Sequence, residues 1–228
     1  MSNSALDPEV AATARRAATV VIVRDGEARA DGSIEVLLLK RSEVGAFPGL
    51  WVFPGGRVDS ADAGDDEISQ ARSAAAREAA EEVGLSVIAD ELVAWSHWSP
   101  PAYQPKRFLT WFFIARWTGE PVVIDEHEIV GSDWFAPADA LTHGLGLAPP
   151  TFVTLHQLAQ RTSVAEALTA GPVLGVERFV TRPGKAGDQP VLMWHGDVGY
   201  EHGDAGDDGP RHRATLNGQR LATYERTL

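Results

Sequence analysis

The chain has 228 residues, which is enough for one large domain or for one domain with an extension. It contains no cysteine, and this excludes disulfides and thiolate metal sites. Its net charge of −12, from 20 basic and 32 acidic residues, argues against binding along a nucleic-acid backbone, but it leaves open a small anionic substrate that a divalent metal bridges to carboxylates.

The N-terminal residues 1–17 are predicted to form a tail or a short helix. Residues 1–16 are polar and rich in alanine, without the apolar core of a signal peptide. No apolar run approaches the ~18 residues that are needed to cross a membrane. We therefore expect a cytoplasmic protein that does not interact with membranes.

The first half of the chain alternates apolar runs with turns. The β-branched and apolar runs predict buried strands, and Asp-Gly pairs mark a loop between the first two. A helix predicted at 68–83 ends at Gly84, which is suited to a left-handed cap. The strands predicted in this half are 18–23, 34–39, 51–53, 85–88 and 91–99.

The second half mixes strands and helices. Its strongest local signal is Asn217-Gly218, which predicts a type I′ hairpin turn between strands at 211–216 and 219–225. The elements interleave without regular βαβ spacing, so a mixed sheet with helices on its faces is expected. The other predicted elements are strands at 107–115 and 129–135 and helices at 137–142, 151–160 and 163–169.

The predicted helix at 68–83 carries three glutamates on one face. Glu78, Glu81 and Glu82 are related as i, i+3 and i+4, and the alanines between them fall on the opposite side. Their mutual repulsion is unfavourable unless a hard cation offsets it, and Mg²⁺ and Mn²⁺ prefer such oxygen ligands. A Glu-rich helix is more often only a solvated face. The upstream Pro-Gly-Gly turn at 54–56 makes the metal-binding alternative more specific.

Together these segments resemble the Nudix box, G-x5-E-x7-R-E-U-x-E-E-x-G-U, in which U is aliphatic. Residues 77–85 match its second half, and Gly56 matches its opening glycine. The glycine and the arginine are 21 residues apart here, against 14 in the pattern, because of an acidic insertion at 59–66. Counted back from the arginine, the first glutamate of the pattern aligns with Ser69, so it is missing or displaced to Glu67.

The resemblance also implies a fold and a domain organisation. The fold class is α/β, a Nudix-type α/β/α sandwich with a mixed sheet, over residues 18–170. Residues 171–228 are expected to be a C-terminal extension that packs on this domain and contains the β-hairpin.

Nudix-type enzymes hydrolyse a diphosphate linked to another moiety, and the resemblance implies that activity with Mg²⁺ or Mn²⁺ as cofactor. It assigns Glu78 and Glu82 as the main metal ligands, with Glu81 and the carbonyl of Gly56 as further ligands. Arg77 would orient the glutamates, although an ordinary i,i+4 ion pair with Glu81 is equally compatible with the sequence.

A general base is often supplied by a downstream loop in this family. The acidic run 125–128 precedes the predicted strand 129–135, and the resemblance favours Glu128 as the base. Two alternatives stay open. The acids of this loop could simply be exposed, and Glu82 could act as both metal ligand and base.

The substrate class rests on a narrower resemblance. The runs 37–42 and 47–56 are similar to a Nudix branch that includes a mammalian peroxisomal coenzyme A diphosphohydrolase, which implies CoA or an acyl-CoA. That branch often has Arg-Phe-Asp-Thr-Arg where this chain has Arg-Phe-Leu-Thr-Trp at 107–111. Arg41 and Arg107 are candidate phosphate ligands, with surface or structural arginines as the alternative.

Two other functions remain open. One is the same chemistry on ADP-ribose, NADH or a nucleotide sugar. The other is a Nudix-fold ligand-binding module without turnover, which the three retained glutamates disfavour. The expected partner is a small-molecule diphosphate and not a nucleic acid, and a homodimer is a candidate assembly.

Overall fold

In a computed structural model, the chain is divided into two compact units. Of the described residues, one unit contains those within 16–96 and 110–177, and the other contains those within 13–15, 97–109 and 178–228. Residues 1–12 of the predicted tail lie outside the described part of the chain. The structure describes residues 13–26, 33–45, 47–104, 107–218 and 220–227.

An eight-stranded mixed sheet forms the centre of the fold. The main strand order is β3-β2-β1-β6-β5-β8, and β4 pairs with β1 while β7 pairs with β2. The strands are β1 (Arg15–Asp25), β2 (Ile34–Arg41), β3 (Trp51–Val52), β4 (Gly55–Arg57), β5 (Val93–Ser99), β6 (Phe108–Arg116), β7 (Ile129–Phe135) and β8 (Glu177–Val180).

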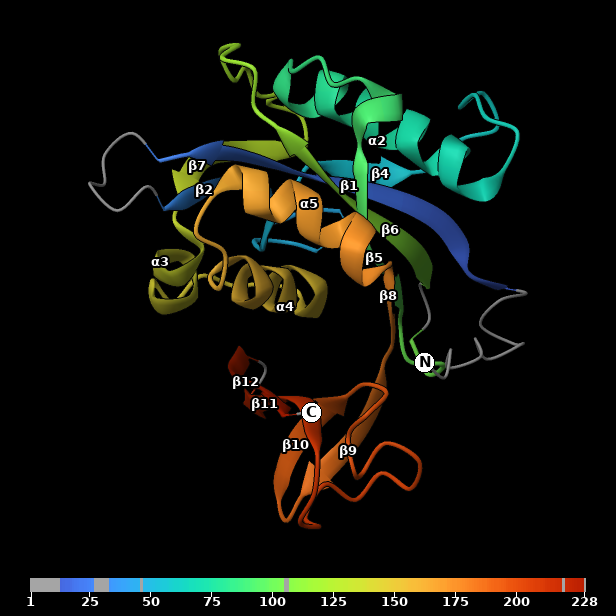
Figure 1. Cartoon of the computed structure of the whole chain (residues 1–228), viewed down its shortest axis with the longest axis vertical. Coiled ribbons are helices and arrows are strands. Elements are labelled where there is room, and N and C mark those ends of the chain that lie inside the picture. The colour runs from blue at the N-terminus through green and yellow to red at the C-terminus, as the bar shows by residue number, and fades with distance from the viewer. Residues whose placement is uncertain (1–12, 27–32, 46, 105–106, 219, 228) are drawn as a thin grey trace. The chain divides into compact units, whose positions relative to one another are not determined.

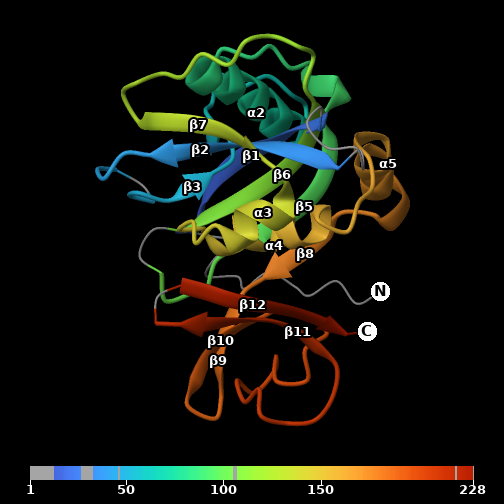
Figure 2. The same ribbon diagram turned by 90° about the vertical axis from the view of Figure 1, so that its left-hand side faces the viewer.

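Helices cover the two faces of this sheet (Figure 1). Helix α2 (Glu67–Val83) lies on one face. Helices α3 (Pro137–Thr142), α4 (Pro149–Leu158) and α5 (Val164–Leu174) lie on the other side, as the turned view also shows (Figure 2). The predicted α/β/α arrangement with a mixed sheet is confirmed. Among the described residues, no helix is both long enough and apolar enough to cross a bilayer.

Small side chains let α2 lie close against the sheet. Its buried face consists of four alanines and Val83, and these pack with alternate residues of β1 such as Val20 and Ile22. Asp66 caps the N-terminus by accepting a hydrogen bond from the Ser69 N–H at 2.8 Å. Gly84 ends the helix at φ 67°, so its predicted role as a left-handed cap is confirmed. The opposite face of α2 is thereby left to the glutamates.

Most predicted elements appear near their expected positions, but two details differ. The strand predicted at 85–88 is absent. This segment leaves the cap of α2, where the Leu85 N–H binds the Ala79 carbonyl, and it leads into the 3₁₀ helix η1 (Ala89–Glu91). In the C-terminal hairpin, Asn217 pairs with Arg220 and so belongs to the strand, whereas the sequence predicted it as the first turn residue.

The second unit contains a separate antiparallel sheet with the order β12-β11-β10-β9. The ion pair between Arg213 and Asp197 is buried in this unit, and Trp98 stacks on Phe179 with ring centroids 4.0 Å apart. The predicted hairpin forms two of the four strands. These strands are β9 (Arg182–Ala186), β10 (Gln189–Met193), β11 (Arg211–Asn217) and β12 (Arg220–Thr227).

Candidate active site

The glycine turn before α2 brings the backbone against the helix carboxylates. A Cβ on Gly55 would lie 2.5 Å from the carbonyl oxygen of Ala18 in β1, with which β4 pairs. A Cβ on Gly56 would lie 2.3 Å from Oε1 of Glu78. These distances are far below van der Waals contact, so glycine is required for this close approach rather than for an unusual φ angle.

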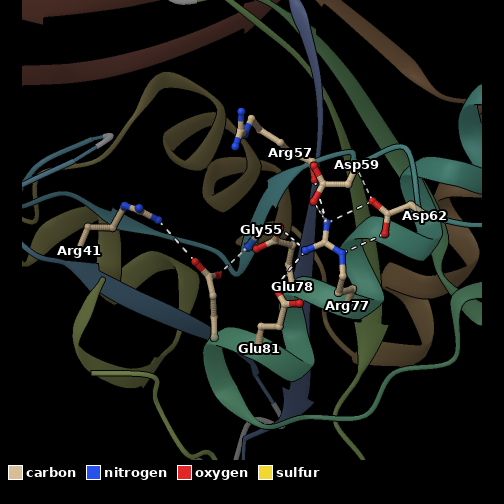
Figure 3. Close-up of polar contacts among 9 residues, drawn as sticks. Arg41, Gly55, Arg57, Asp59, Asp62, Arg77, Glu78 and Glu81 are labelled. Atoms are coloured by element: carbon tan, nitrogen blue, oxygen red, sulfur yellow. Dashed lines mark hydrogen bonds and ion pairs between the residues drawn. The ribbon is translucent and has the colours of Figure 1, made fainter. Parts of the chain in front are cut away.

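Arg77 is the centre of a hydrogen-bond cluster at one end of the site (Figure 3). Its Nη1 donates to Glu78 at 2.8 Å and to Glu81 at 3.0 Å. Its Nε and Nη2 bind the two carboxylate oxygens of Asp62 at 2.9 and 3.1 Å, and Nη2 also donates to the Arg57 carbonyl at 2.9 Å. Arg77 therefore holds the glutamates of α2 against the preceding loop.

Asp62 was not recognised in the sequence as a site residue. It follows Gly56 after five intervening residues, which is the spacing of the first glutamate in the box, so the additional residues lie after it rather than before it. Counting forward from the glycine would have found it. Glu67, the expected replacement, instead accepts a hydrogen bond from the indole N–H of Trp111 at 2.8 Å.

The Asp62 carboxylate is fixed in its charged form. Burial acts to raise its pKa, but hydrogen bonds from the Arg77 guanidinium and from the Asp59 N–H outweigh burial, and the net pKa is below its ordinary value. An ionised, buried partner of this kind fixes the Arg77 side chain in one position.

Glu82 is the most perturbed carboxylate of the site. Its Oε2 accepts a hydrogen bond from the Gly55 N–H at 2.9 Å, and its Oε1 lies 3.5 Å from Nη1 of Arg41. Burial raises the pKa of Glu82 to about 7, and repulsion from Glu78 and Glu128 adds to the increase, while the Gly55 N–H and Arg41 act in the opposite direction. The site thus holds a carboxylate whose ionised form a nearby cation would stabilise.

Glu78 and Glu81 differ from each other in environment. The side chain of Glu78 is 15% exposed and that of Glu81 is 57% exposed. Burial raises the pKa of Glu78, and the Arg77 guanidinium opposes this increase while repulsion from Glu81 and Asp59 adds to it. Glu78 and Glu82 are therefore the inner carboxylates, and Glu81 lies toward solvent.

Glu128 meets Arg41 where β2 and β7 run side by side. These strands are antiparallel, with Arg41 opposite Ile129. The Nη2 of Arg41 donates to Oε2 of Glu128, and the Ser42 N–H donates to the Glu128 carbonyl at 2.9 Å. The structure thus brings Arg41, Glu82 and Glu128 together from three different elements, through the guanidinium of Arg41.

Arg107, the second predicted phosphate ligand, belongs to the other compact unit. Its guanidinium donates to the carbonyl of Ala102 at 2.7 Å. Its role in substrate binding stays a prediction.

The carboxylates of Glu78, Glu81 and Glu82 are oxygen donors of the kind that a hard divalent cation prefers. In the described part of the chain, no three Asp, Glu or His side chains converge as a preformed metal cluster. Arg77 is hydrogen-bonded to Glu78 and Glu81, and Arg41 lies beside Glu82. Glu78 and Glu82 are partly buried carboxylates with raised pKa values, so their ionised forms are electrostatically unfavourable, and a cation that prefers oxygen ligands would offset this cost.

Comparison with known proteins agrees with this geometry. Residues 13–155 match the family model described as NUDIX domain. A putative nudix hydrolase 7 of Caenorhabditis elegans is 29% identical over 167 residues, which cover 55% of this chain and 56% of that protein. This chain thus spans little more than half the length of that relative.

Solved structures show the same fold. A NUDIX hydrolase from Alicyclobacillus acidocaldarius is 26% identical with a TM-score of 0.60, over 68% of this chain and 96% of that one. The NUDIX domain of Shewanella oneidensis NrtR, crystallised with ADP ribose, is 18% identical with a TM-score of 0.52, over 69% of this chain and 94% of that one. The family match, the fold and the glutamate-bearing helix agree, and the chain belongs to the NUDIX family of hydrolases.

Proposed function

We propose that this protein hydrolyses the diphosphate linkage of a nucleoside diphosphate derivative with Mg²⁺ or Mn²⁺ as cofactor. The observation that carries the proposal is the environment of Glu82. This partly buried carboxylate accepts a hydrogen bond from the Gly55 N–H, lies on one helix face with Glu78, and is joined to Glu128 through Arg41. Membership of the Nudix family supports the reaction class. It also supports the metal, because Nudix hydrolases generally use divalent metal ions.

The cation would be held by Glu78, Glu82 and Glu81 together with the Gly56 carbonyl. When bound, a divalent metal offsets phosphate charge and lowers the pKa of a coordinated water. Arg77 keeps Glu78 and Glu81 in place through Nη1, while Asp62 holds the other side of the guanidinium. The narrow turn at Gly56 lets the Glu78 carboxylate lie against the backbone.

Glu128 is the proposed general base. Its carboxylate is 69% exposed, so a water molecule can reach it, and its ion pair with Arg41 keeps it close to Glu82. A base must lie within hydrogen-bond reach of the proton that it removes, directly or through one water. The alternative is that Glu82 accepts the proton itself, which its pKa of about 7 supports.

The substrate proposed first is CoA or an acyl-CoA, cleaved to 3′,5′-ADP and a phosphopantetheine fragment. The proposal rests on the resemblance of the segments at 37–42 and 47–56 to the coenzyme A branch. Arg107 remains a candidate for contact with the phosphates. For Arg41, which was also predicted as a phosphate ligand, the contacts with Glu82 and Glu128 favour a different role. The second candidate class is ADP-ribose, NADH or a nucleotide sugar. ADP ribose is the ligand of the Shewanella domain described above, and the changes at Leu109 and Trp111 weigh against the coenzyme A branch.

A substrate panel with mass identification of the products tests both candidates. Wild-type protein is assayed with Mg²⁺, with Mn²⁺ and with EDTA on CoA, acetyl-CoA, ADP-ribose and NADH. We expect turnover with either metal and none in EDTA. Unchanged turnover in chelator would contradict the metal-dependent mechanism. A kcat/KM more than tenfold higher for ADP-ribose or NADH, about 1.4 kcal/mol in the barrier, would favour the second class.

A catalytic protein is proposed rather than a ligand-binding module, because Glu78, Glu81 and Glu82 are all present and Arg77 is hydrogen-bonded to the first two. We also propose that residues 18–170 form the catalytic domain, that 171–228 are an extension of it, that the protein acts in the cytoplasm, and that a homodimer is its candidate assembly. Light scattering of the full chain would measure the last of these.

A further inference from the structure

Arg41 is a buried cation shared by two carboxylates. It is the last residue of β2, and its side chain is 10% exposed. Nη1 lies 3.5 Å from Glu82, which is 12% exposed, and Nη2 is hydrogen-bonded to Glu128, which is 69% exposed. The two terminal nitrogens therefore connect a partly buried acid of α2 with an exposed acid that precedes β7.

The rest of the Arg41 guanidinium is not fully paired. Its Nε is buried and has no hydrogen-bond partner among the residues that the structure describes. An unpaired buried donor costs stability, but Arg72 and Arg161 also have such an Nε, so the contacts of the terminal nitrogens are what distinguish Arg41. The guanidinium is thus oriented by Glu82 and Glu128, at the cost of leaving Nε unpaired.

Glu128 depends on the end of β2 for its position. Its backbone carbonyl accepts the Ser42 N–H, and its side chain accepts the adjacent Arg41 guanidinium. Without the second contact, a side chain with this exposure would sample several rotamers in solvent. The backbone contact alone fixes the residue but not its carboxylate.

We propose, on the basis of the diphosphatase function proposed above, that Arg41 is a positioning residue that holds the Glu128 carboxylate beside Glu82. It acts on the reaction through Glu128 and not through a phosphate of the substrate. Loss of the contact between Arg41 and Glu128 should leave the metal ligands in position but displace the Glu128 carboxylate. Misplacement of a catalytic group by about 1 Å can reduce the rate about 10²-fold.

A double-mutant cycle between Arg41→Met and Glu128→Gln tests this role. Steady-state kinetics with saturating Mg²⁺ should show that Arg41→Met lowers kcat about 10²-fold while KM changes by less than about threefold. The double variant should be no slower than the slower single variant, because both changes remove the same positioned base. Lys40→Met is the matched control: Lys40 is the adjacent, exposed cation on β2, and this change should leave kcat and KM unaltered.

The opposite pattern would overturn the proposal. An Arg41→Met variant with a raised KM and an unchanged kcat, or with an effect that multiplies with that of Glu128→Gln, would make Arg41 a substrate ligand. Normal turnover of Glu128→Gln would also overturn it. Arg41→Lys replaces the Met variant if that variant does not fold, because lysine keeps the charge but lacks the forked guanidinium that reaches two carboxylates. The kcat of Arg41→Lys should be lowered, while its thermal unfolding should match that of the wild type.

A second readout does not depend on turnover. In EDTA, the decrease in thermal unfolding midpoint caused by Arg41→Met should be smaller in the Glu128→Gln background than in the wild type. Additive decreases would show that the two side chains are not coupled and would contradict the proposal. A wild-type protein that hydrolyses no diphosphate would instead contradict the proposed function, and the unfolding cycle would still decide whether Arg41 holds Glu128.

Discussion

At the scale of single residues, the site is defined by carboxylates that burial and mutual repulsion disfavour in their ionised form. Glu82 shows this most clearly, because its pKa is raised to about 7 although the Gly55 N–H and Arg41 favour its charged form. An ionised carboxylate of this kind destabilises the metal-free protein, and a bound cation would stabilise it.

Glu82→Gln should separate catalysis from folding. The substitution keeps the side-chain volume but removes a ligand charge, so kcat should fall about 10²–10⁴-fold, the range for loss of a general base. The metal-free protein should be no less stable, because one like-charge repulsion with Glu78 is removed. Glu67→Gln is the control: the amide oxygen can still accept the Trp111 N–H, so turnover should be retained. An active Glu82→Gln enzyme would place the chemistry elsewhere.

Metal-free stability should depend on pH through the same carboxylate. The folded-state pKa of about 7 lies above the ordinary value of 4.5, so the folded protein binds more protons than the unfolded chain between these values. The free energy of unfolding must therefore decrease as pH rises through this window. Urea unfolding in EDTA at pH 5 and pH 8 measures the effect. In Glu82→Gln, the free energy of unfolding should fall less between pH 5 and pH 8 than in the wild type. Equal pH dependence in the two proteins would show that Glu82 is not the group responsible.

Gly56→Ala should damage metal binding more than folding. The added Cβ would lie 2.3 Å from Oε1 of Glu78, and a flexible carboxylate can move away where backbone could not. We expect Mn²⁺ affinity, measured by calorimetry, to fall at least about tenfold, as for loss of a group that orients metal ligands. In Gly131→Ala the new Cβ would meet only the Cβ of Lys40 at 3.9 Å, so that control should bind Mn²⁺ normally.

At the scale of elements, the important connection is between α2 and the acidic loop that precedes it. The loop supplies Asp66 as the N-cap of the helix and Asp62 as the partner of Arg77. The insertion lengthens this loop without separating either contact from α2. Two of the acidic residues of this loop, Asp62 and Asp66, therefore have structural roles.

Asp62→Asn should weaken this connection. The amide keeps the shape of the side chain but loses the charge that binds two nitrogens of Arg77. The expected cost is about 1.5–3 kcal/mol of unfolding free energy, the range for hydrogen bonds to a charged group. Asp65→Asn, in the same loop and exposed, should change stability little. Equal unfolding midpoints in urea for the two variants would show that the Asp62–Arg77 contact does not stabilise α2.

Local signals predicted the elements well where local chemistry determines them. Strand 129–135 and helix 137–142 were predicted with the bounds that the structure has, because an apolar strand is followed by a proline in the first turn of a helix. The strand predicted at 85–88 was wrong, because the cap of α2 and the Glu120 carboxylate engage the N–H groups of Leu85 and Ser86. Hydropathy does not reveal such tertiary hydrogen bonds.

The site was predictable only in part for a related reason. The spacing of Glu78, Glu81 and Glu82 is local to one helix and could be read from the sequence. The contact of Arg41 with Glu128 spans 87 residues and exists because β2 and β7 pair. The sequence at 125–128 does not indicate that Arg41 is the partner of Glu128. Asp62 matches the box only when residues are counted forward from Gly56, and not when they are counted back from Arg77.

At the scale of the whole molecule, the chain contains two compact units with different stabilising interactions. The unit with α2 is built around alanines and aliphatic strand residues. The other unit contains a fully buried ion pair, with Arg213 at 1% and Asp197 at 0% side-chain exposure. Burial acts to raise the pKa of Asp197, but hydrogen bonds from Arg213 and from the N–H groups of His212 and Gly199 lower it overall.

Arg213→Met should therefore destabilise the second unit selectively. It leaves the buried Asp197 charge without its guanidinium partner, and such losses cost on the order of 3–5 kcal/mol. Hydrogen exchange followed by mass spectrometry should show lost protection in β9–β12 and retained protection in α2, since each unit has its own buried contacts. Arg211→Met is the control on the same strand, because its ion pair with Glu225 is exposed enough to contribute only about 0–1 kcal/mol. Equal loss of protection in α2 would show instead that the two units unfold together, and that the stability of the glutamate site depends on the C-terminal sheet.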